Sequence, residues 1–146
     1  MTNNKILIKT KSKTYPIYLG DEILKSAGKR IKERLPGIKK IIIIADKKIP
    51  LVFLKKLTLS LKKYKLRTYK IEANERTKSF KTANYLIEKL IQNNLSREDC
   101  VISFGGGIVS DITAFVANLT KRGIKFINIP TTLLAQVDAS IGGKTA

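Results

Sequence analysis

This 146-residue chain contains a glycine triplet of the kind that can bind a phosphate group. The triplet, Gly105-Gly106-Gly107, lies between a short apolar run and a helical pattern. Glycines at a strand-to-helix turn let backbone N–H groups and the positive end of the helix dipole approach a pyrophosphate. The triplet is not a full G-x-G-x-x-G, because Ser110 holds the last position. No acidic residue stands about twenty positions further on to bind a ribose. Alone, the triplet also fits a tight turn without a ligand.

Carboxylates follow two other runs that fit β-strands. Asp46 comes directly after the apolar run 41–45, and Glu75 comes after 66–71. If these runs are parallel strands, both carboxylates lie at the same sheet edge as the triplet, where they could bind ribose hydroxyls. Each one alone also fits a helix cap or a solvated charge. Asp111, one turn into the helix after the triplet, can equally complement the helix dipole.

The segment 131–138 brings two hydroxyls, an amide and a carboxylate to the same expected edge, just before a glycine pair that presents Lys144. Arg122 and Lys144 are cations that a phosphate or carboxylate substrate would need. Arg122 also fits the last turn of a helix that Gly123 ends. The segment 142–145 is no P-loop, because Asp138 stands where that motif requires a glycine.

Residue types that the chain lacks exclude several chemistries. It contains no histidine, which excludes a Ser-His-Asp triad, a Cys-His pair and a His-ligated zinc site made by this chain alone. Its one cysteine, Cys100, cannot form an intramolecular disulfide and lies in an apolar run. We expect Cys100 to be a small buried side chain without a redox role.

The elements that must position these residues are strands alternating with helices, which predicts right-handed βαβ units. We therefore expect an α/β fold, a Rossmann-like, doubly wound, mostly parallel sheet with an N-terminal β-hairpin. Such sheets bind ligands beyond the carboxyl ends of their strands. The expected strands are 5–10, 14–19, 41–45, 66–71, 101–104 and 126–129, and the expected helices are 21–34 with Asp21 as its N-cap, one beginning at Pro50, 79–93 and 108–119.

The charge balance, 29 basic against 11 acidic residues and a net charge of +18, raises the question of an anionic partner. The excess lies mostly before residue 100, away from the glycine-rich part, and lysine outnumbers arginine 23 to 6. Scattered lysine is typical of a solvated surface, which disfavours nucleic-acid binding. The N-terminus lacks a signal peptide's apolar stretch, and the longest aliphatic run is too short to span a bilayer, so we expect a cytoplasmic protein with no membrane partner.

Several segments together resemble the 3-dehydroquinate synthase family. The specific matches are Phe104–Asp111, Lys121–Gly123 and Ile129–Ala146, and Asn74–Ser79 looks like that family's Gly-Glu-x-x-Lys element. Iron-dependent alcohol and glycerol dehydrogenases share the triplet and a Pro-Thr-Thr, but usually continue with a Gly/Ser-rich segment. Other sugar-phosphate cyclases tend to lose the Gly-Gly-Lys-Thr ending.

The resemblance implies a dimeric, two-domain enzyme of the shikimate pathway, in which an NAD-binding α/β domain precedes a mostly helical domain that binds zinc or cobalt. The family converts 3-deoxy-D-arabino-heptulosonate 7-phosphate to 3-dehydroquinate and phosphate, with NAD oxidising a ring alcohol transiently. On this interpretation residues 1–146 are the NAD-binding domain, the helical domain would follow, and the chain alone is inactive.

The resemblance also assigns roles to residues of this chain, none of them catalytic or metal-binding. Two departures from the family pattern, Asn74 and Ser110 in place of glycines, fall in turns that we expect to survive. The assigned residues are Asp46, Glu75 and Lys78 for ribose hydroxyls; Gly105, Gly106, Gly107 and Asp111 for the pyrophosphate region; Thr131 and Thr132 for the nicotinamide side; Asp138 and Lys144 for substrate; and Arg122 for substrate phosphate in a neighbouring subunit.

Other hypotheses remain open at this point. A metal-dependent polyol or alcohol dehydrogenase, or another sugar-phosphate cyclase, would use the same cofactor turn. A non-catalytic basic module that binds nucleic acid would use the lysines instead. An NAD-binding regulatory or scaffolding role is a further alternative.

Overall fold

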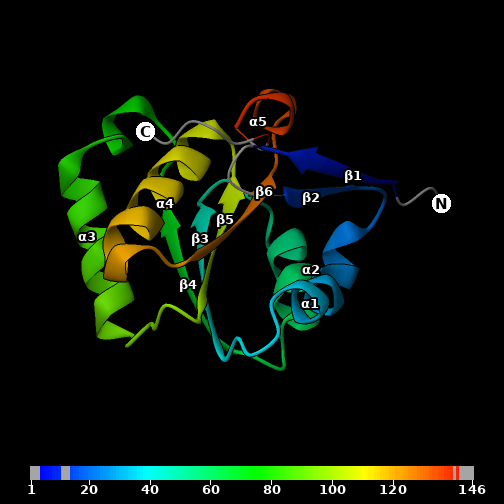
Figure 1. Ribbon diagram of the computed structural model, residues 1–146. Coiled ribbons are helices and arrows are strands. Elements are labelled where there is room, and N and C mark those ends of the chain that lie inside the picture. The colour runs from blue at the N-terminus through cyan, green and yellow to red at the C-terminus, as the bar shows by residue number, and fades with distance from the viewer. Residues whose placement is uncertain (1–3, 11–13, 140, 142–146) are drawn as a thin grey trace.

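Four consecutive isoleucines, Ile41–Ile44, form the centre of the fold, because both faces of their strand are covered. The computed structural model describes residues 4–10, 14–139 and 141. In it, β3 lies between two parallel neighbours, and the strand order is β4-β3-β5-β6 (Figure 1). The strands are β3 (Lys40–Asp46), β4 (Lys65–Ile71), β5 (Cys100–Gly105) and β6 (Lys125–Pro130).

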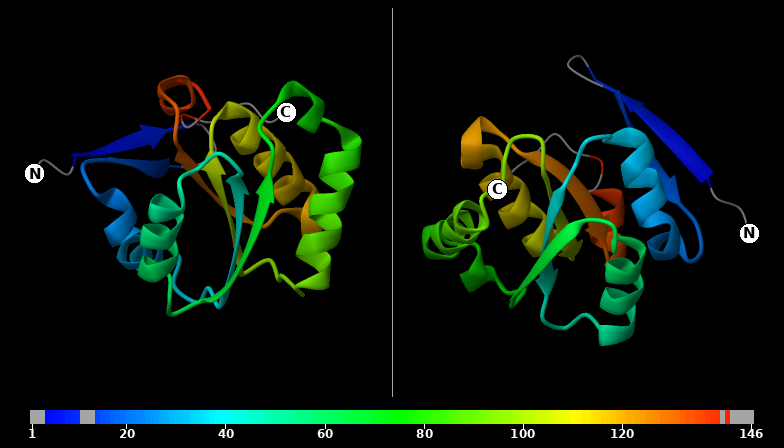
Figure 2. Two further views of the ribbon diagram at one scale, coloured as in Figure 1. Left: turned by 180° about the vertical axis from the view of Figure 1, so that it is seen from behind. Right: turned by 90° about the horizontal axis from the view of Figure 1, so that it is seen from below.

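Helices cover both faces of this sheet, as Figures 1 and 2 show. Side chains of β3 alternate between two cores: Ile41 and Ile43 pack on the side of α1 and α2, and Ile42 and Ile44 pack on the side of α3 and α4. This alternation is what a strand buried on both faces requires. The predicted doubly wound α/β fold is confirmed. The helices are α1 (Ile23–Arg34), α2 (Leu51–Ser60), α3 (Phe80–Gln92) and α4 (Gly107–Leu119).

The predicted N-terminal hairpin is present as β1 (Asn4–Lys9) and β2 (Thr14–Leu19), paired antiparallel and separate from the main sheet. It contacts α1 through Tyr18, since the Arg30 guanidinium lies 4.4 Å from the centre of the Tyr18 ring. The Tyr15 hydroxyl donates a hydrogen bond to the Ile141 carbonyl, which ties the hairpin to the last described part of the chain.

Helices α1 and α2 pack in direct backbone contact at Gly28. A Cβ atom at this position would lie 1.9 Å from the Ser60 carbonyl oxygen, so only glycine permits the approach. The prediction that Asp21 caps α1 is wrong: Glu22 holds the N-cap position with φ 53°, and no side chain of the described residues caps the helix. The Glu22 carboxylate instead lies 2.6 Å from the Lys25 ammonium, and this pairing lowers its pKa.

A buried carboxylate braces the amino edge of the sheet. Asp99, 4% exposed, accepts hydrogen bonds from the backbone N–H groups of Lys40 (2.9 Å) and Ser96 (2.8 Å) and from the Ser96 hydroxyl (2.9 Å). Burial alone would raise the pKa of Asp99, but these donors outweigh it and hold the pKa below its usual value. Neighbouring Cys100 is fully buried and free, as predicted, and burial raises the pKa of its thiol.

Three short helices in the described residues lie outside the predicted helix ranges. They are η1 (Glu75–Thr77), η2 (Thr120–Arg122) and α5 (Leu133–Val137). Helix α3 begins and ends as predicted, with Ser79 as its N-cap and Asn93 as its C-cap. Ile91 continues the helical spacing of the buried Ala83 and Leu90 but is 51% exposed. Within the described residues, no helix has both the length and the apolarity to span a bilayer.

Candidate functional site

The connections of the sheet reverse direction between β3 and β5. From β3 the chain crosses through α2 to β4 on one side, and β5 then pairs with β3 on the other side. Asp46 ends β3 and Gly105 ends β5, and these strands are paired in register at Ala45 and Phe104. The carboxylate and the glycine turn therefore meet at the topological switch point, which is where open α/β sheets bind ligands.

The glycine turn is shaped as a cradle for an anion. Gly106 is the N-cap of the 13-residue helix α4, and Gly107 is its first residue. Apart from its chain neighbours and its own helix backbone, a Cβ atom at Gly107 would meet no atom of the described residues within 4 Å, whereas one at Gly105 would lie 2.8 Å from the Val109 side chain. The space in front of Gly107 is therefore open to a ligand. The first N–H groups of α4 have no partner within the helix and can donate to phosphate oxygens.

An ion pair flanks this turn. The Lys78 ammonium lies 2.7 Å from the Asp111 carboxylate, so the segment after β4 is joined to α4. The hydrogen bond with Asp111 raises the pKa of Lys78 against the opposing effect of burial, and the charge of Glu75 adds to the increase. The structure thus brings Lys78 and Asp111 into contact and places Glu75 close enough for its charge to act on Lys78. Glu75 itself is exposed, in η1.

The turn around Asn74 survives, as expected, but for a different reason. We expected asparagine to tolerate a positive φ there, whereas Asn74 is extended, with φ −139°. Its side chain caps η1 by accepting a hydrogen bond of 3.1 Å from the Thr77 N–H. The second substituted position, Ser110, is buried in α4, and its backbone N–H donates to the Gly106 carbonyl at 3.0 Å. A glycine is therefore not required at either position.

The threonine pair contacts the glycine turn directly. The Thr131 N–H donates to the Gly105 carbonyl at 2.9 Å. A Cβ atom at Gly106 would lie 3.2 Å from the Thr132 methyl carbon, so this threonine packs over the turn. The Thr132 hydroxyl also caps α5 by accepting from the Ala135 N–H at 3.3 Å. The glycine turn (Gly105–Gly107) and the two threonines therefore form one continuous surface, the wall of the candidate site.

Asp46 keeps its carboxylate at the carboxyl edge by closing a local turn. Its Oδ1 atom accepts a hydrogen bond of 2.9 Å from the Lys48 N–H. This contact orients the side chain without burying it fully. A carboxylate held in this way can accept hydrogen bonds from hydroxyls of a ligand.

Of the residues predicted to contact substrate, Arg122 lies away from the glycine turn. Arg122 follows α4 in η2, at the amino edge of the sheet and thus at the opposite end from the glycine turn; it is exposed and has φ 61°. Asp138 is exposed at the end of α5. Lys144 lies outside the described residues.

Sequence reasoning missed Asn128 in β6, which lies in register with Ser103 of β5. The Asn128 Oδ1 atom accepts hydrogen bonds from the hydroxyls of Ser103 at 2.6 Å and Ser110 at 2.8 Å. The available signal was that Ser103 and Asn128 each interrupt an apolar strand pattern. Buried polar groups in such places have partners.

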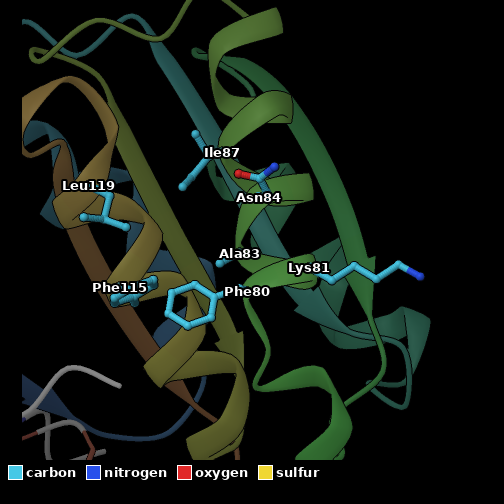
Figure 3. Close-up of a pocket in the computed structure, with 7 residues that line it drawn as sticks. All are labelled: Phe80, Lys81, Ala83, Asn84, Ile87, Phe115 and Leu119. Atoms are coloured by element: carbon cyan, nitrogen blue, oxygen red, sulfur yellow. The ribbon is translucent and has the colours of Figure 1, made fainter.

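A separate groove lies between α3 and α4, with a volume of about 370 Å³, and Figure 3 shows its lining. The rings of Phe80 and Phe115 meet edge to face there, with centres 6.4 Å apart. Phe115 is one helical turn beyond Asp111, so the groove begins beside the ion pair and continues away from the sheet edge. Within the described part of the chain, no three His, Cys, Asp or Glu residues cluster as metal ligands would.

Comparisons with known proteins agree on a family. A family model described as 3-dehydroquinate synthase N-terminal matches residues 68–146. A 3-dehydroquinate synthase from Pelagibacter ubique (strain HTCC1062) is 42% identical over 141 residues, which cover 97% of this chain and 38% of that relative. The chain therefore spans well under half the length of the curated relatives it matches.

Solved structures share the fold. 2-Deoxy-scyllo-inosose synthase superposes with a TM-score of 0.88 at 23% identity, over 98% of this chain and 40% of that one. 2-Epi-5-epi-valiolone synthase from Streptomyces hygroscopicus subsp. jinggangensis 5008, solved with NAD⁺ and Zn²⁺ bound, superposes at 0.67 with 28% identity, over 74% and 31% of the two chains. The family match, supported by this shared fold, shows that the chain belongs to the 3-dehydroquinate synthase family.

Proposed function

We propose that this chain is the NAD-binding part of an enzyme that converts 3-deoxy-D-arabino-heptulosonate 7-phosphate to 3-dehydroquinate and phosphate, which makes the enzyme a phosphate-eliminating lyase. One observation carries the proposal: the glycine turn lies at the switch point with the Lys78–Asp111 pair on one flank and the threonines on the other. NAD suits this arrangement because Gly107 faces open space and the first N–H groups of α4 can donate to a diphosphate.

Each group in the site has a role that its chemistry supports. Asp46, Glu75 and Lys78 bind ribose hydroxyls, since carboxylates accept and an ammonium donates hydrogen bonds. Asp111 lies in the pyrophosphate region, where its negative charge alone would repel phosphate. The pairing with Lys78 offsets that repulsion. Thr131 and Thr132 form the nicotinamide side.

When bound, NAD supplies a reversible hydride acceptor, which makes the proton next to the oxidised ring carbon acidic enough for phosphate to be eliminated. The described residues bind and orient that cofactor. The zinc or cobalt ion that the family resemblance implies does not fit the described residues, which hold no suitable cluster. We assign it, with the helical domain, to the portion of the relatives that this chain does not match.

Asp138 and Lys144 contact the substrate in this proposal, and the full-length enzyme is a cytoplasmic homodimer. The position of Arg122 supports the homodimer. Arg122 lies at the amino edge of the sheet, opposite the glycine turn, so its side chain does not reach the site of its own chain. In a homodimer it can enter the site of the neighbouring subunit. Its guanidinium is suited to bind the substrate phosphate there.

Isothermal titration of the chain with NAD tests the cofactor proposal. We expect saturable binding that Gly107→Val weakens at least about tenfold, a loss of about 1.4 kcal/mol. Asn118→Val, on an exposed position of the same helix, is the matched control and retains wild-type affinity. A wild-type chain that shows no binding at millimolar NAD refutes the proposal.

Two further assays separate the alternatives. A polyol dehydrogenase would accumulate NADH from glycerol, whereas the proposed enzyme returns its hydride in each turnover. A nucleic-acid-binding module would bind RNA with a steep salt dependence and would not bind NAD.

A further inference from the structure

The polar network around Asn128 spans four segments that border the candidate site. Its Oδ1 atom accepts hydrogen bonds from Ser103 in β5 and from Ser110 in α4, and its Nδ2 atom donates to the Ala139 carbonyl, just after α5, at 3.3 Å. Ser103 is fully buried and Ser110 is 2% exposed. The serine side of the network is therefore shielded from water, which strengthens its hydrogen bonds, whereas Asn128 and Ala139 are half-buried.

The orientation of the Asn128 amide follows from its partners. A hydroxyl can donate or accept, so the two serines alone would permit either orientation. The Ala139 carbonyl can only accept, so it must face the NH₂ group. The oxygen then faces both serines and uses its two lone pairs on their hydroxyls. A flipped amide would instead point its oxygen at the Ala139 carbonyl, and neither oxygen has a hydrogen to donate.

The network reaches the glycine turn through Ser110. Its hydroxyl lies 3.1 Å from the Gly106 carbonyl and 2.8 Å from Asn128 Oδ1. Asn128 thus lies between the turn that faces the ligand and the chain that follows α5. Among the described residues of β6, Asn128 alone has side-chain hydrogen bonds both to α4 and to the segment that follows α5.

Helix α5 depends on such anchors. It has five residues, too few for a helix that is stable by itself. Its side chains contribute little burial, since Leu133, Leu134 and Val137 are 76%, 74% and 59% exposed, while Ala135 is buried. The positions of Thr131, Thr132 and α5 are therefore set by a few specific contacts rather than by a large apolar interface.

We propose that Asn128 is a positioning residue that fixes the segment 131–139 against the glycine turn. Resting on the proposed function, this means that Asn128 holds the nicotinamide side of the NAD site at its working distance from the pyrophosphate side. It does so through Ala139 and Ser110, without touching the cofactor.

The variant Asn128→Asp removes the hydrogen bond from Asn128 Nδ2 to the Ala139 carbonyl and keeps the acceptor for the two serines. Aspartate keeps the shape and the acceptor for both serines, but it replaces the donor with an oxygen that faces the Ala139 carbonyl. Asn118→Asp is the matched control, because it makes the same chemical change on an exposed face of α4. Ser110→Ala is a milder second variant that removes one hydroxyl and lowers the risk of unfolding.

Hydrogen exchange and two nucleotides provide the readouts. In Asn128→Asp we expect faster amide exchange in 131–139 and unchanged exchange in β4. NAD affinity should fall at least about tenfold while ADP-ribose, which lacks nicotinamide, stays within about twofold. Ser110→Ala should shift both readouts in the same direction by less, and Asn118→Asp should leave them unchanged. A general structural role would weaken both nucleotides together.

Unchanged exchange in 131–139, or an equal loss of NAD and ADP-ribose affinity, overturns this inference while leaving the proposed function standing. A wild-type chain that binds neither nucleotide overturns the proposed function and the cofactor role of Asn128 with it. Wild-type NAD binding together with an NAD-selective loss in Asn128→Asp supports both.

Discussion

The Lys78 ammonium lies 2.7 Å from the Asp111 carboxylate and joins the segment after β4 to the helix that begins at the glycine turn. Both side chains remain partly exposed, at 35% and 28%, so the pair contributes little to folding stability. Its importance is electrostatic. It determines the net charge beside the turn where a diphosphate would bind.

Removing Lys78 should therefore reduce nucleotide affinity more than stability. We expect Lys78→Ala to weaken NAD binding about tenfold, since Asp111 is left uncompensated. The double variant with Asp111→Asn should recover part of that loss, because the repulsive charge is gone. Titration calorimetry measures both affinities and thermal melting measures stability. A double variant that binds no better than Lys78→Ala contradicts this account.

Replacing Gly28 should destabilise the fold without involving the site. Alanine is the better helix former by about 1 kcal/mol, but its methyl would lie 1.9 Å from the Ser60 carbonyl oxygen, which is backbone and cannot rotate away. We expect Gly28→Ala to lower the free energy of unfolding by about 1–3 kcal/mol. Urea denaturation checks this, with Gly107→Ala as the control in open space. Equal stability of the two variants would disprove the contact.

Asp99 should make stability depend on pH. Its pKa is lowered from 3.8 in the folded chain, so its carboxylate stabilises the fold above the unfolded-state pKa, and this contribution is lost as the pH falls through the folded-state pKa. We expect Asp99→Asn to cost about 1–3 kcal/mol at pH 7. The difference between wild type and variant should shrink below pH 4 or so, roughly the unfolded-state pKa.

Urea unfolding at a series of pH values measures that difference. Glu33→Gln, at an exposed helical position, is the control and should show no such convergence. A gap that stays constant down to the acid limit would mean that folding does not lower the pKa of Asp99.

Cys100 should report global unfolding. Its side chain is fully buried and burial raises its pKa, so the reactive thiolate is scarce and inaccessible in the folded chain. We expect alkylation by iodoacetamide to be slow in buffer and fast in denaturing urea, as followed by mass spectrometry. Fast labelling of the native chain would show that β5 opens locally.

The sheet was predictable because β3 is a continuous apolar run, β5 and β6 are mostly apolar, and β4 has apolar residues at Leu66, Tyr69 and Ile71. Helix α3 was predictable because Ser79 and Asn93 mark its ends. The shared carboxyl edge followed from parallel pairing alone. The cap of α1 and the five-residue α5 were not predictable, since single capping contacts decide them. The pairing of Lys78 with Asp111 needed the packing of two segments distant in sequence, which no local pattern contains.

The same isoleucines that make β3 easy to recognise leave its alignment with its neighbours unspecified. A shift of one residue would still place isoleucine side chains in both cores, because Ile41–Ile44 serve the two faces equally. The Asp99 carboxylate, which binds the N–H groups of Lys39 and Lys40, selects one alignment at the start of the strand. One residue of slippage would move Asp46 by about 3.3 Å along the strand direction. The hydrogen bonds of Asp99 at the start of β3 therefore also fix the position of the Asp46 carboxylate at the ligand-binding end of the strand.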